Sequence, residues 1–271
     1  MYALDFQYDN RYLSDYGFMV CDFNGQDGAN FVSAGSQITF EKTKRNNGYK
    51  HSLISAQYNE CVTTEFDICK IPEIYDDLEI TNEECRDLFR WLARKEFCKF
   101  NVLSENENDF ETCYFLASFT IKKIYIREKL FGLHLTMQTD SPFGFGNTKQ
   151  YTKNVSNGSG TITIDDESDE IGDTNILMEV TCKSSGNLVI TNTTTGLATV
   201  INNCSYNEVI TINSDLQIIT SSDSNHNIMN DFNFIFFKIS NSLTGRKNTI
   251  RFSMPCSVSI TYTPIIKDIP H

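Results

Sequence analysis

Residues 81–97, TNEECRDLFRWLARKEF, constrain the fold most, because this is the one stretch whose pattern strongly predicts a helix. Thr81 and Glu84 have the spacing of a capping box, in which the hydroxyl and the carboxylate each accept a hydrogen bond from the other residue's backbone N–H. An apolar stripe recurs along the stretch at helical spacing: Cys85, Leu88, Phe89 and Leu92, widened by Trp91 and Phe97. Such a stripe has to be buried, and the rest of the chain offers strands, so we expect one helix lying on a sheet.

Strand patterns fill the remainder of the first half. Apolar and polar residues alternate over residues 2–8 and again over residues 62–68. Two longer runs, residues 114–124 and 129–137, predict the central hairpin of a sheet. Loops are predicted where Gly, Asn, Ser or acidic residues cluster, at residues 14–17, 24–35, 45–50 and 104–109.

The composition shifts sharply at residues 150–160, QYTKNVSNGSG, which predicts a domain boundary there. Short strands follow at intervals of about 8–12 residues, the pattern of a β-sandwich. We predict them at residues 161–164, 176–182, 188–192, 197–202, 208–213, 216–220, 232–238, 248–254 and 257–263. The expected fold is mainly β: an N-terminal sheet domain with one packed helix over residues 1–150, then a sandwich domain over residues 155–271.

The net charge and the cysteines indicate which binding partners and which cellular compartment to expect for this protein. A formal net charge of −12, spread over both halves, repels phosphate backbones and argues against nucleic-acid binding as the main function. The nine cysteines include no C-x-x-C pair, which indicates buried free thiols in a reducing cytoplasm. No signal-peptide pattern and no apolar run of about 20 residues is visible, so we expect neither secretion by that route nor a membrane span.

Candidate chemical sites are weak throughout the sequence. The acidic run at residues 165–170, DDESDE, lacks the pattern of an EF-hand loop and is expected to be a solvated turn. His51, His134, His226 and His271 show no metal-ligand spacing, and His134 is expected to have a surface or inter-strand role. No serine-hydrolase elbow or phosphate-binding loop occurs. Trp91 is expected to be core rather than a sugar platform. We therefore predict no catalytic residues, no cofactor site and no metal site.

The order of elements resembles the distal tail protein family of bacteriophages with long non-contractile tails. The residues that carry this resemblance are LSDYGF at 13–18, DLFRWLARK at 87–95 and DSPFGF at 140–145 in the first half. In the second half they are GNLVITNTTTG at 186–196, EVITIN at 208–213 and SLTGRKNTIRF at 242–252. The resemblance covers nearly the whole chain.

The resemblance implies a structural protein with no enzymatic activity. Its N-terminal domain would form a ring, usually a hexamer, that extends the tail tube at the tail tip and lets DNA pass without sequence-specific binding. Its C-terminal domain would be a galectin-like sandwich that carries receptor-binding or baseplate proteins. The implied partners are further copies of the chain, the tail tube and tape-measure proteins, and a tail-associated lysin or tail fibre. The implied location is the virion tail tip, assembled in the cytoplasm of the host bacterium.

Two alternatives remain open at this point. The first is a carbohydrate-binding β-sandwich protein that attaches to host cell-surface glycans. The second, a hydrolase, is disfavoured because no nucleophile–base motif occurs. The charged side of the 81–97 stretch, with Arg86, Arg90 and Arg94, is expected either to be solvated or to face a neighbouring subunit. On either interpretation, charge reversal at Arg90 or Arg94 is expected to leave folding intact.

Overall fold

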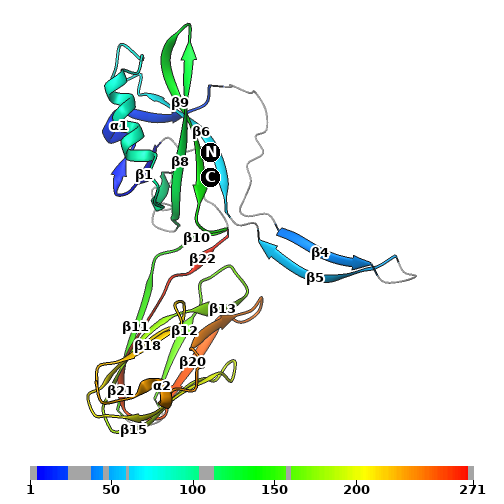
Figure 1. The fold of residues 1–271 in the computed structure, drawn as a ribbon, viewed down its shortest axis with the longest axis vertical. Coiled ribbons are helices and arrows are strands. Elements are labelled where there is room, and N and C mark those ends of the chain that lie inside the picture. The colour runs from blue at the N-terminus through cyan, green and yellow to red at the C-terminus, as the bar shows by residue number, and fades with distance from the viewer. Residues whose placement is uncertain are drawn as a thin grey trace. The chain divides into compact units, whose positions relative to one another are not determined.

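The fold is mainly β, as predicted, in a computed structural model that describes residues 5–23, 38–44, 49–58, 61–103, 113–156 and 160–267. The chain divides into two compact units (Figure 1). The first comprises residues 1–146 together with residues 266–271, and the second comprises residues 147–265. The predicted loops at residues 24–35 and 104–109 lie outside the described residues, as do Tyr2 and Leu4 of the first predicted strand.

A seven-stranded antiparallel sheet forms the body of the first unit, in the order β2-β1-β7-β8-β9-β6-β3. The two long runs predicted as a central hairpin are β8 and β9, and they lie in the middle of this sheet. Arg127 and Glu128 join them with φ of 48° and 69°, the left-handed backbone that a two-residue hairpin turn requires. The strands are β1 (Asp5–Tyr8), β2 (Arg11–Tyr12), β3 (Phe18–Cys21), β6 (Thr63–Lys70), β7 (Cys98–Leu103), β8 (Phe115–Ile126) and β9 (Lys129–Thr139).

The helix α1 (Asn82–Leu92) begins as predicted and ends five residues early. The Glu84 N–H donates to Thr81 Oγ1 at 3.3 Å and the Thr81 N–H donates to Glu84 Oε2 at 2.7 Å, so the capping box is formed. Beyond Leu92, the Arg94 Nε donates to the carbonyl oxygen of Trp91 and satisfies a free acceptor of the last turn. The chain then turns and enters β7, which leaves Phe97 47% exposed instead of adding it to the apolar stripe.

The core of the first unit lies between α1 and the sheet. Trp91 is 3% exposed and stacks on Phe6 and on Tyr16, with ring centroids 5.8 Å and 4.6 Å away. Phe6 and Tyr8 also contact Phe119 of β8. Trp91 is therefore core, as predicted. The helix buries four side chains in this core: Cys85, Leu88, Trp91 and Leu92.

The short 3-10 helix η1 (Ser14–Tyr16) confirms the turn predicted at residues 14–17. Gly17 closes it with φ 77°, a left-handed conformation that favours glycine. A Cβ at this position would also collide with the ring of Tyr75. The glycine of the LSDYGF motif is thus required by both backbone conformation and space.

Two further strands of the first unit pair only with each other among the described strands. They are β4 (Ile38–Lys44) and β5 (His51–Tyr58), and they form a two-stranded antiparallel hairpin. A second two-stranded sheet joins β10 (Gly144–Phe145) and β22 (Ile265–Ile266). Ile266 packs against the core of the first unit, which explains why the chain end clusters there.

The second unit is a β-sandwich with a single apolar core shared by both sheets. The five-stranded sheet has the order β11-β21-β14-β17-β18, and the four-stranded sheet has the order β12-β20-β15-β16. A two-stranded sheet of β13 and β19 accompanies them. The strands are β11 (Lys149–Val155), β12 (Thr161–Asp165), β13 (Gly172–Asn175), β14 (Leu177–Cys182), β15 (Gly186–Asn192), β16 (Ala198–Cys204), β17 (Val209–Asn213), β18 (Ile218–Ser221), β19 (Lys238–Asn241), β20 (Lys247–Phe252) and β21 (Cys256–Tyr262).

In the second half, residues 150–155 lie within β11, which pairs with β21 through seven residue pairs, and the two units divide between residues 146 and 147. One strand prediction in this half is wrong. Residues 232–237 are not a strand, because helix α2 (Ile228–Asp231) precedes them and β19 begins only at Lys238. Instead, Asn233 turns its side chain to the edge of β16, accepting from the Val200 N–H at 3.1 Å and donating to the Ala198 carbonyl at 3.0 Å.

Candidate interaction surfaces

His134 and His226, two of the histidines singled out in the sequence, have structural contacts. His134 Nδ1 lies 2.7 Å from Asp67 Oδ1 on the neighbouring strand, which confirms its inter-strand role. His51 is exposed on β5, and His271 lies outside the described residues. No group of three or more His, Cys, Asp or Glu side chains in the described part of the chain is arranged to hold a metal ion.

The run at residues 165–170, predicted to be a solvated turn, is solvated only in part. Asp166 and Ser168 are both 0% exposed. Asp166 Oδ1 accepts from the Ser168 N–H at 3.0 Å and Asp166 Oδ2 accepts from Thr174 Oγ1 at 2.8 Å. These bonds compensate the carboxylate for its loss of water, so Asp166 and Ser168 form a buried corner of the sandwich, while Asp165 and Glu167 are exposed.

A buried ionic cluster lies in the second unit, around His226. Its Nδ1 is 2.5 Å from Glu208 Oε1 and its Nε2 is 3.3 Å from Asp231 Oδ2. Burial lowers the pKa of His226, but the hydrogen bond and the charge of Glu208 outweigh it and the pKa is raised. Burial raises the pKa of Glu208, and hydrogen bonds from Ser221, His226 and the Ser205 N–H outweigh it and lower that pKa. The cluster therefore favours a charged imidazolium–carboxylate pair.

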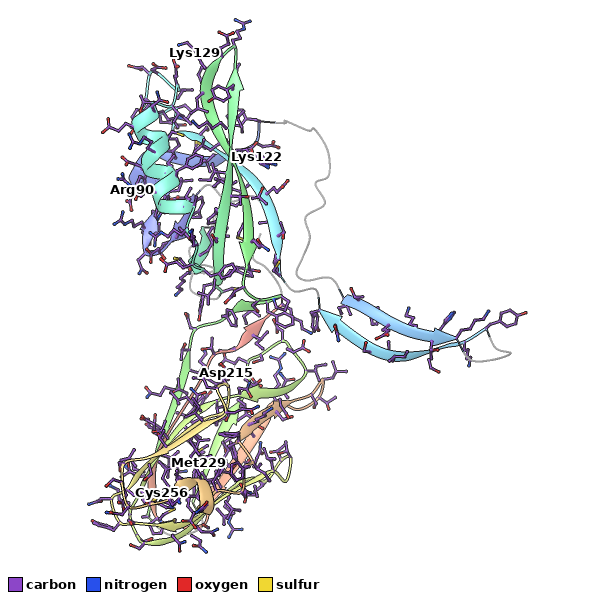
Figure 2. All side chains as sticks on the ribbon, viewed as in Figure 1. Arg90, Lys122, Lys129, Asp215, Met229 and Cys256 are labelled. Carbon is purple, nitrogen blue, oxygen red and sulfur yellow. The ribbon has the colours of Figure 1, made fainter. Side chains whose placement is uncertain are left out.

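The β4–β5 hairpin carries large apolar side chains that no other described strand covers (Figure 2). Phe40 is 51% exposed, and Leu53 and Ile54 are 58% and 59% exposed. Ile38 and Tyr49 are exposed as well. An isolated two-stranded hairpin is marginally stable in water, so this surface is suited to contact with another chain. Most of the loop predicted at residues 45–50 lies outside the described residues, and no sequence pattern indicated that these apolar side chains stay uncovered.

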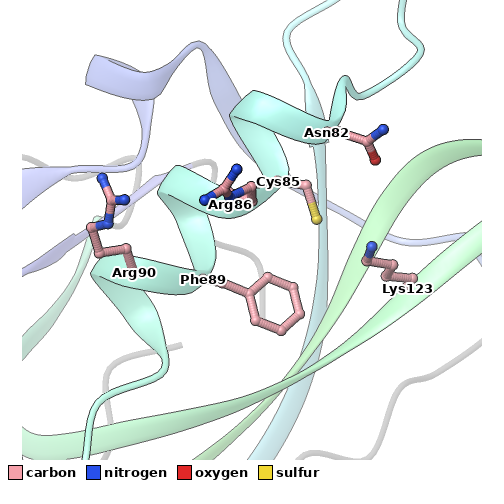
Figure 3. A pocket seen from close by; sticks show the side chains of 6 residues that line it. All are labelled: Asn82, Cys85, Arg86, Phe89, Arg90 and Lys123. Carbon is pink, nitrogen blue, oxygen red and sulfur yellow. The ribbon is translucent and has the colours of Figure 1, made fainter.

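A groove of about 520 Å³ lies between α1 and the far end of β8 (Figure 3). Figure 3 shows the Phe89 ring extending from α1 toward the strand that carries Lys123. Phe89 was predicted to belong to the buried stripe, but it is only partly buried and forms part of the groove. The lining residues are Asn82, Cys85, Arg86, Phe89, Arg90 and Lys123.

An aromatic side chain stands on the surface of the second unit at Phe234. It is 61% exposed, and its φ of 57° is a left-handed conformation that bulky residues rarely adopt. The neighbouring Asn233 fixes this segment to β16, and the Phe232 ring lies 5.5 Å from the Phe234 ring. The sequence missed this feature because the run FNFIFF has the apolar content of a buried strand.

Apolar, cationic and aromatic side chains thus stand on the surfaces of two strand-built units, and exposed apolar patches often mark sites of contact with other molecules. A family model described as the phage tail protein N-terminal domain matches residues 1–141, and one described as the phage tail C-terminal domain matches residues 143–262. The chain belongs to this family of phage tail proteins. It is therefore a component of the virion tail, and membership implies association with other tail proteins.

The fold has a close counterpart among solved structures. The Dit protein (gp 19.1) of phage SPP1 aligns with a TM-score of 0.65 and 12% sequence identity, over 96% of this chain and 98% of that one. That structure is described as a paradigm of the hub adsorption apparatus of phages that infect Gram-positive bacteria. The expected resemblance to distal tail proteins is confirmed. No curated protein matches the sequence.

The family and the fold point to a structural role in the tail rather than a catalytic one. None of the helices in the described part of the chain is long and apolar enough to cross a lipid bilayer.

Proposed function

We propose that this protein is the hub of a phage tail tip. In this proposal its first unit forms a ring, hexameric by analogy with the distal tail family, that extends the tail tube. Its second unit, a galectin-like sandwich, anchors receptor-binding or other tail-tip proteins. The partners are the tail tube protein, the tape-measure protein, and a tail-associated lysin or fibre, assembled in the host cytoplasm. The likeness to a hub protein over nearly the full length of both chains supports this role.

The observation that carries the ring is the uncovered β4–β5 hairpin. Phe40, Leu53 and Ile54 are each more than half exposed to water. In this state they do not contribute the free energy that burial of an apolar side chain provides. Contact with a neighbouring copy would bury them. We infer that the hairpin of one copy contacts a different surface of the next copy. Such a contact is head-to-tail, and its repetition generates a ring when the rotation closes.

A second feature supports a ring that passes DNA. The face of the seven-stranded sheet opposite α1 carries polar side chains with little net charge, including Ser118, Thr120, Thr136 and Gln138, together with the His134–Asp67 pair. A polar face without a cationic cluster does not trap phosphates. In the proposed ring this face lines the channel and lets the duplex slide.

Assembly of the full-length protein tests the ring. It is mixed with the neighbouring tail proteins and examined by sedimentation and negative-stain microscopy. Wild-type protein is expected to form rings, and a variant with Phe40, Leu53 and Ile54 changed to Ser is expected to fold normally and stay monomeric. Leu243→Ser, which alters an even more exposed apolar residue of the second unit, is the control and should assemble. A wild-type protein that stays monomeric with every partner present contradicts the ring.

Phe234 favours a second candidate function, attachment to host cell-surface glycans by the sandwich. An aromatic ring exposed to solvent offers a flat apolar face on which a sugar ring can stack. The strained backbone at this residue supports a functional reason for its exposure. A glycan array with full-length protein and with Phe234→Ser tests it: binding lost in the variant supports the function, and no binding at millimolar glycan removes it.

A further inference from the structure

Beyond Ala117, β8 has a paired neighbour on only one side. β7 pairs with β8 at Phe115, Leu116 and Ala117, whereas β9 continues along β8 as far as Ile126. The described part of the chain places no strand beside the remaining length of β8 on the β7 side. An open strand edge of this kind is a template on which another chain can add a strand.

At the level of the groove, the backbone groups that face this open edge belong to Ile121 and Lys123. The carbonyl oxygen of Leu116 accepts from the Asp140 N–H, on the β9 side of β8. Hydrogen-bonding groups alternate between the two edges of a strand, and the β8–β9 register is continuous up to Ile124. The N–H and C=O groups of Ile121 and Lys123 therefore point away from β9. No backbone hydrogen bond joins them to another described element.

The helix α1 lines the groove together with Lys123, whose side chain points from β8 toward the helix (Figure 3). The helical members follow the spacing i, i+3, i+4, i+7 and i+8, which places them on a single stripe: Asn82, Cys85, Arg86, Phe89 and Arg90. An extended segment in this groove would lie between a strand edge and a helix face. Its backbone would reach the edge, and alternate side chains would reach the helix.

The length of the groove matches about five extended residues. Asn82 and Arg90 are eight residues apart, which is about 12 Å along a helix. Five residues of a strand span about 13 Å, over four steps. Because successive side chains of a strand alternate between its faces, the first, third and fifth side chains of such a segment would face the helix.

The charge of the groove is opposite to that of the protein. Its lining contains three cations and no carboxylate, in a chain whose formal net charge is −12. Arg86 and Lys123 have no ion pair among the described residues, and Arg90 pairs with the exposed Asp87 at 3.5 Å. Such an exposed pair contributes little stability. Phe89 adds an apolar surface among the cations. The complementary segment therefore carries carboxylates on either side of an apolar side chain.

The described strands of this chain do not supply such a segment. No edge strand of the described sheets carries more than one carboxylate. Two of them are basic instead: β2 carries Arg11, and β11 carries Lys149 and Lys153. Like charges that meet at an interface disfavour the contact. The charge of the groove thus favours a segment from a different protein over an edge strand of a second copy.

We propose that α1 and β8 form a binding site for an extended acidic segment of another tail protein, which adds to β8 as a strand. The backbone of the segment bonds to Ile121 and Lys123, its central apolar side chain packs on Phe89, and its carboxylates pair with Arg86, Arg90 and Lys123. Family membership implies that such partner proteins exist. The inference goes beyond the proposed hub, since it specifies the chemistry of a partner and does not depend on ring formation.

A short synthetic peptide tests the charge and the spacing. It has glutamate, leucine and glutamate at alternate positions, threonine between them and a fluorescent label at one end. Fluorescence anisotropy is expected to show binding to the full-length protein. The same peptide with lysine in place of glutamate is expected not to bind. No binding of the glutamate peptide at millimolar concentration, or equal binding of the lysine peptide, overturns the proposal.

Two N-methylated forms of the peptide test whether it binds as a strand. Methylation of a backbone nitrogen removes its N–H donor, and the N–H groups of a strand alternate between its two edges. One form is methylated on the glutamates and the leucine, and the other on the threonines. One form is expected to lose binding and the other to keep it, because only one set of N–H groups faces β8. Loss of binding in both forms, or in neither, overturns strand addition.

Single charge reversals place the site on the protein. R86E and K123E are each expected to weaken peptide binding by about tenfold or more, as for the loss of close charge pairs at an interface. K122E is the matched control and should bind as the wild type does, since neighbouring side chains of a strand point to opposite faces. Circular dichroism and thermal melts check that every variant folds. Equal binding by K123E and K122E overturns the assignment of the groove.

The outcomes for the peptide and for the ring are independent. Rings that form normally from a protein that does not bind the peptide overturn this inference and leave the hub intact. Peptide binding by a protein that forms no rings with its tail partners supports this inference and counts against the hub.

Discussion

The indole Nε1 of Trp91 donates a hydrogen bond to the backbone carbonyl oxygen of Tyr8, 3.1 Å away. This bond joins α1 to β1 across 83 residues of sequence, inside the core of the first unit. Because β1 pairs with β7, the bond also fixes the helix relative to the sheet. The bond therefore couples the helix, which local sequence encodes, to the sheet of the first unit.

Trp91→Phe is expected to destabilise the first unit by about 1–3 kcal/mol, because it leaves the buried carbonyl of Tyr8 without its donor. Denaturant unfolding followed by circular dichroism measures the change, since Trp91 is the only tryptophan and fluorescence is lost with it. Phe97→Ala, at an exposed aromatic next to the helix, should change the stability little. Equal effects of the two substitutions would contradict the assigned role of the Trp91 bond.

Charge reversal at Arg94 is expected to weaken the fold, contrary to the expectation from sequence. The Arg94 guanidinium donates to Asp9 Oδ2 at 2.7 Å and to the Trp91 carbonyl at 2.9 Å, and it is three-quarters buried. Because Asp9 is partly exposed and solvent screens the pair, Arg94→Glu should cost about 1–2 kcal/mol. Arg90→Glu, at a side chain 77% exposed, should leave the midpoint of thermal unfolding unchanged. Indistinguishable midpoints for the two variants would show that the Arg94 contacts contribute nothing.

Gly17→Ala is expected to destabilise the first unit by more than about 1 kcal/mol, since alanine is strained at φ 77° and its methyl group meets Tyr75. Gly196→Ala gives a useful comparison: its φ is 79°, but nothing lies within 4 Å of an added Cβ. Each substitution lowers the free energy of unfolding by a measurable amount. The difference between the two losses gives the part that comes from the collision with Tyr75. If Gly17→Ala costs no more than Gly196→Ala, the packing of Tyr75 on this turn is loose.

The His226–Glu208 pair predicts the pH dependence of the second unit. The pKa of His226 is raised above its ordinary value of 6.5, so its contribution to stability is fully present below pH 6.5 and is lost as the pH rises through the folded-state pKa. The pKa of Glu208 is lowered from 4.5, so its contribution is present above pH 4.5 and is lost as the pH falls through the folded-state value. The pair is therefore most stabilising between these two pH values.

Thermal melts at about pH 6 and about pH 9 test this directly, because the imidazolium is lost within that interval. The unfolding midpoint of the second unit should fall with rising pH in the wild type, and the fall should be smaller in His226→Gln. Asp223 and Asp231 also act on His226 and remain in the variant, so the comparison isolates the imidazole. The same pH dependence in both proteins would rule out this pair as its source.

The two surfaces of the first unit illustrate the limit of sequence interpretation. The apolar residues of the β4–β5 hairpin and the partly buried Phe89 have the same local patterns as core residues. Whether such a side chain is covered depends on which element lies above it, and that element is distant in sequence. The cations of the groove were visible as the charged side of a helix, but the approach of Lys123 from β8 was not.

The sequence by itself determined the start of α1, the central β8–β9 hairpin and most strands of the sandwich. These features depend on residues a few positions apart: Thr81 with Glu84, or the alternation along a strand. The tertiary structure alone decided where α1 ends, because Arg94 meets an aspartate 85 residues away. It also buried Asp166, by supplying the Thr174 hydroxyl, and held Phe234 in water, by fixing Asn233 to β16. Burial is a property of contacts between segments, which no local pattern encodes.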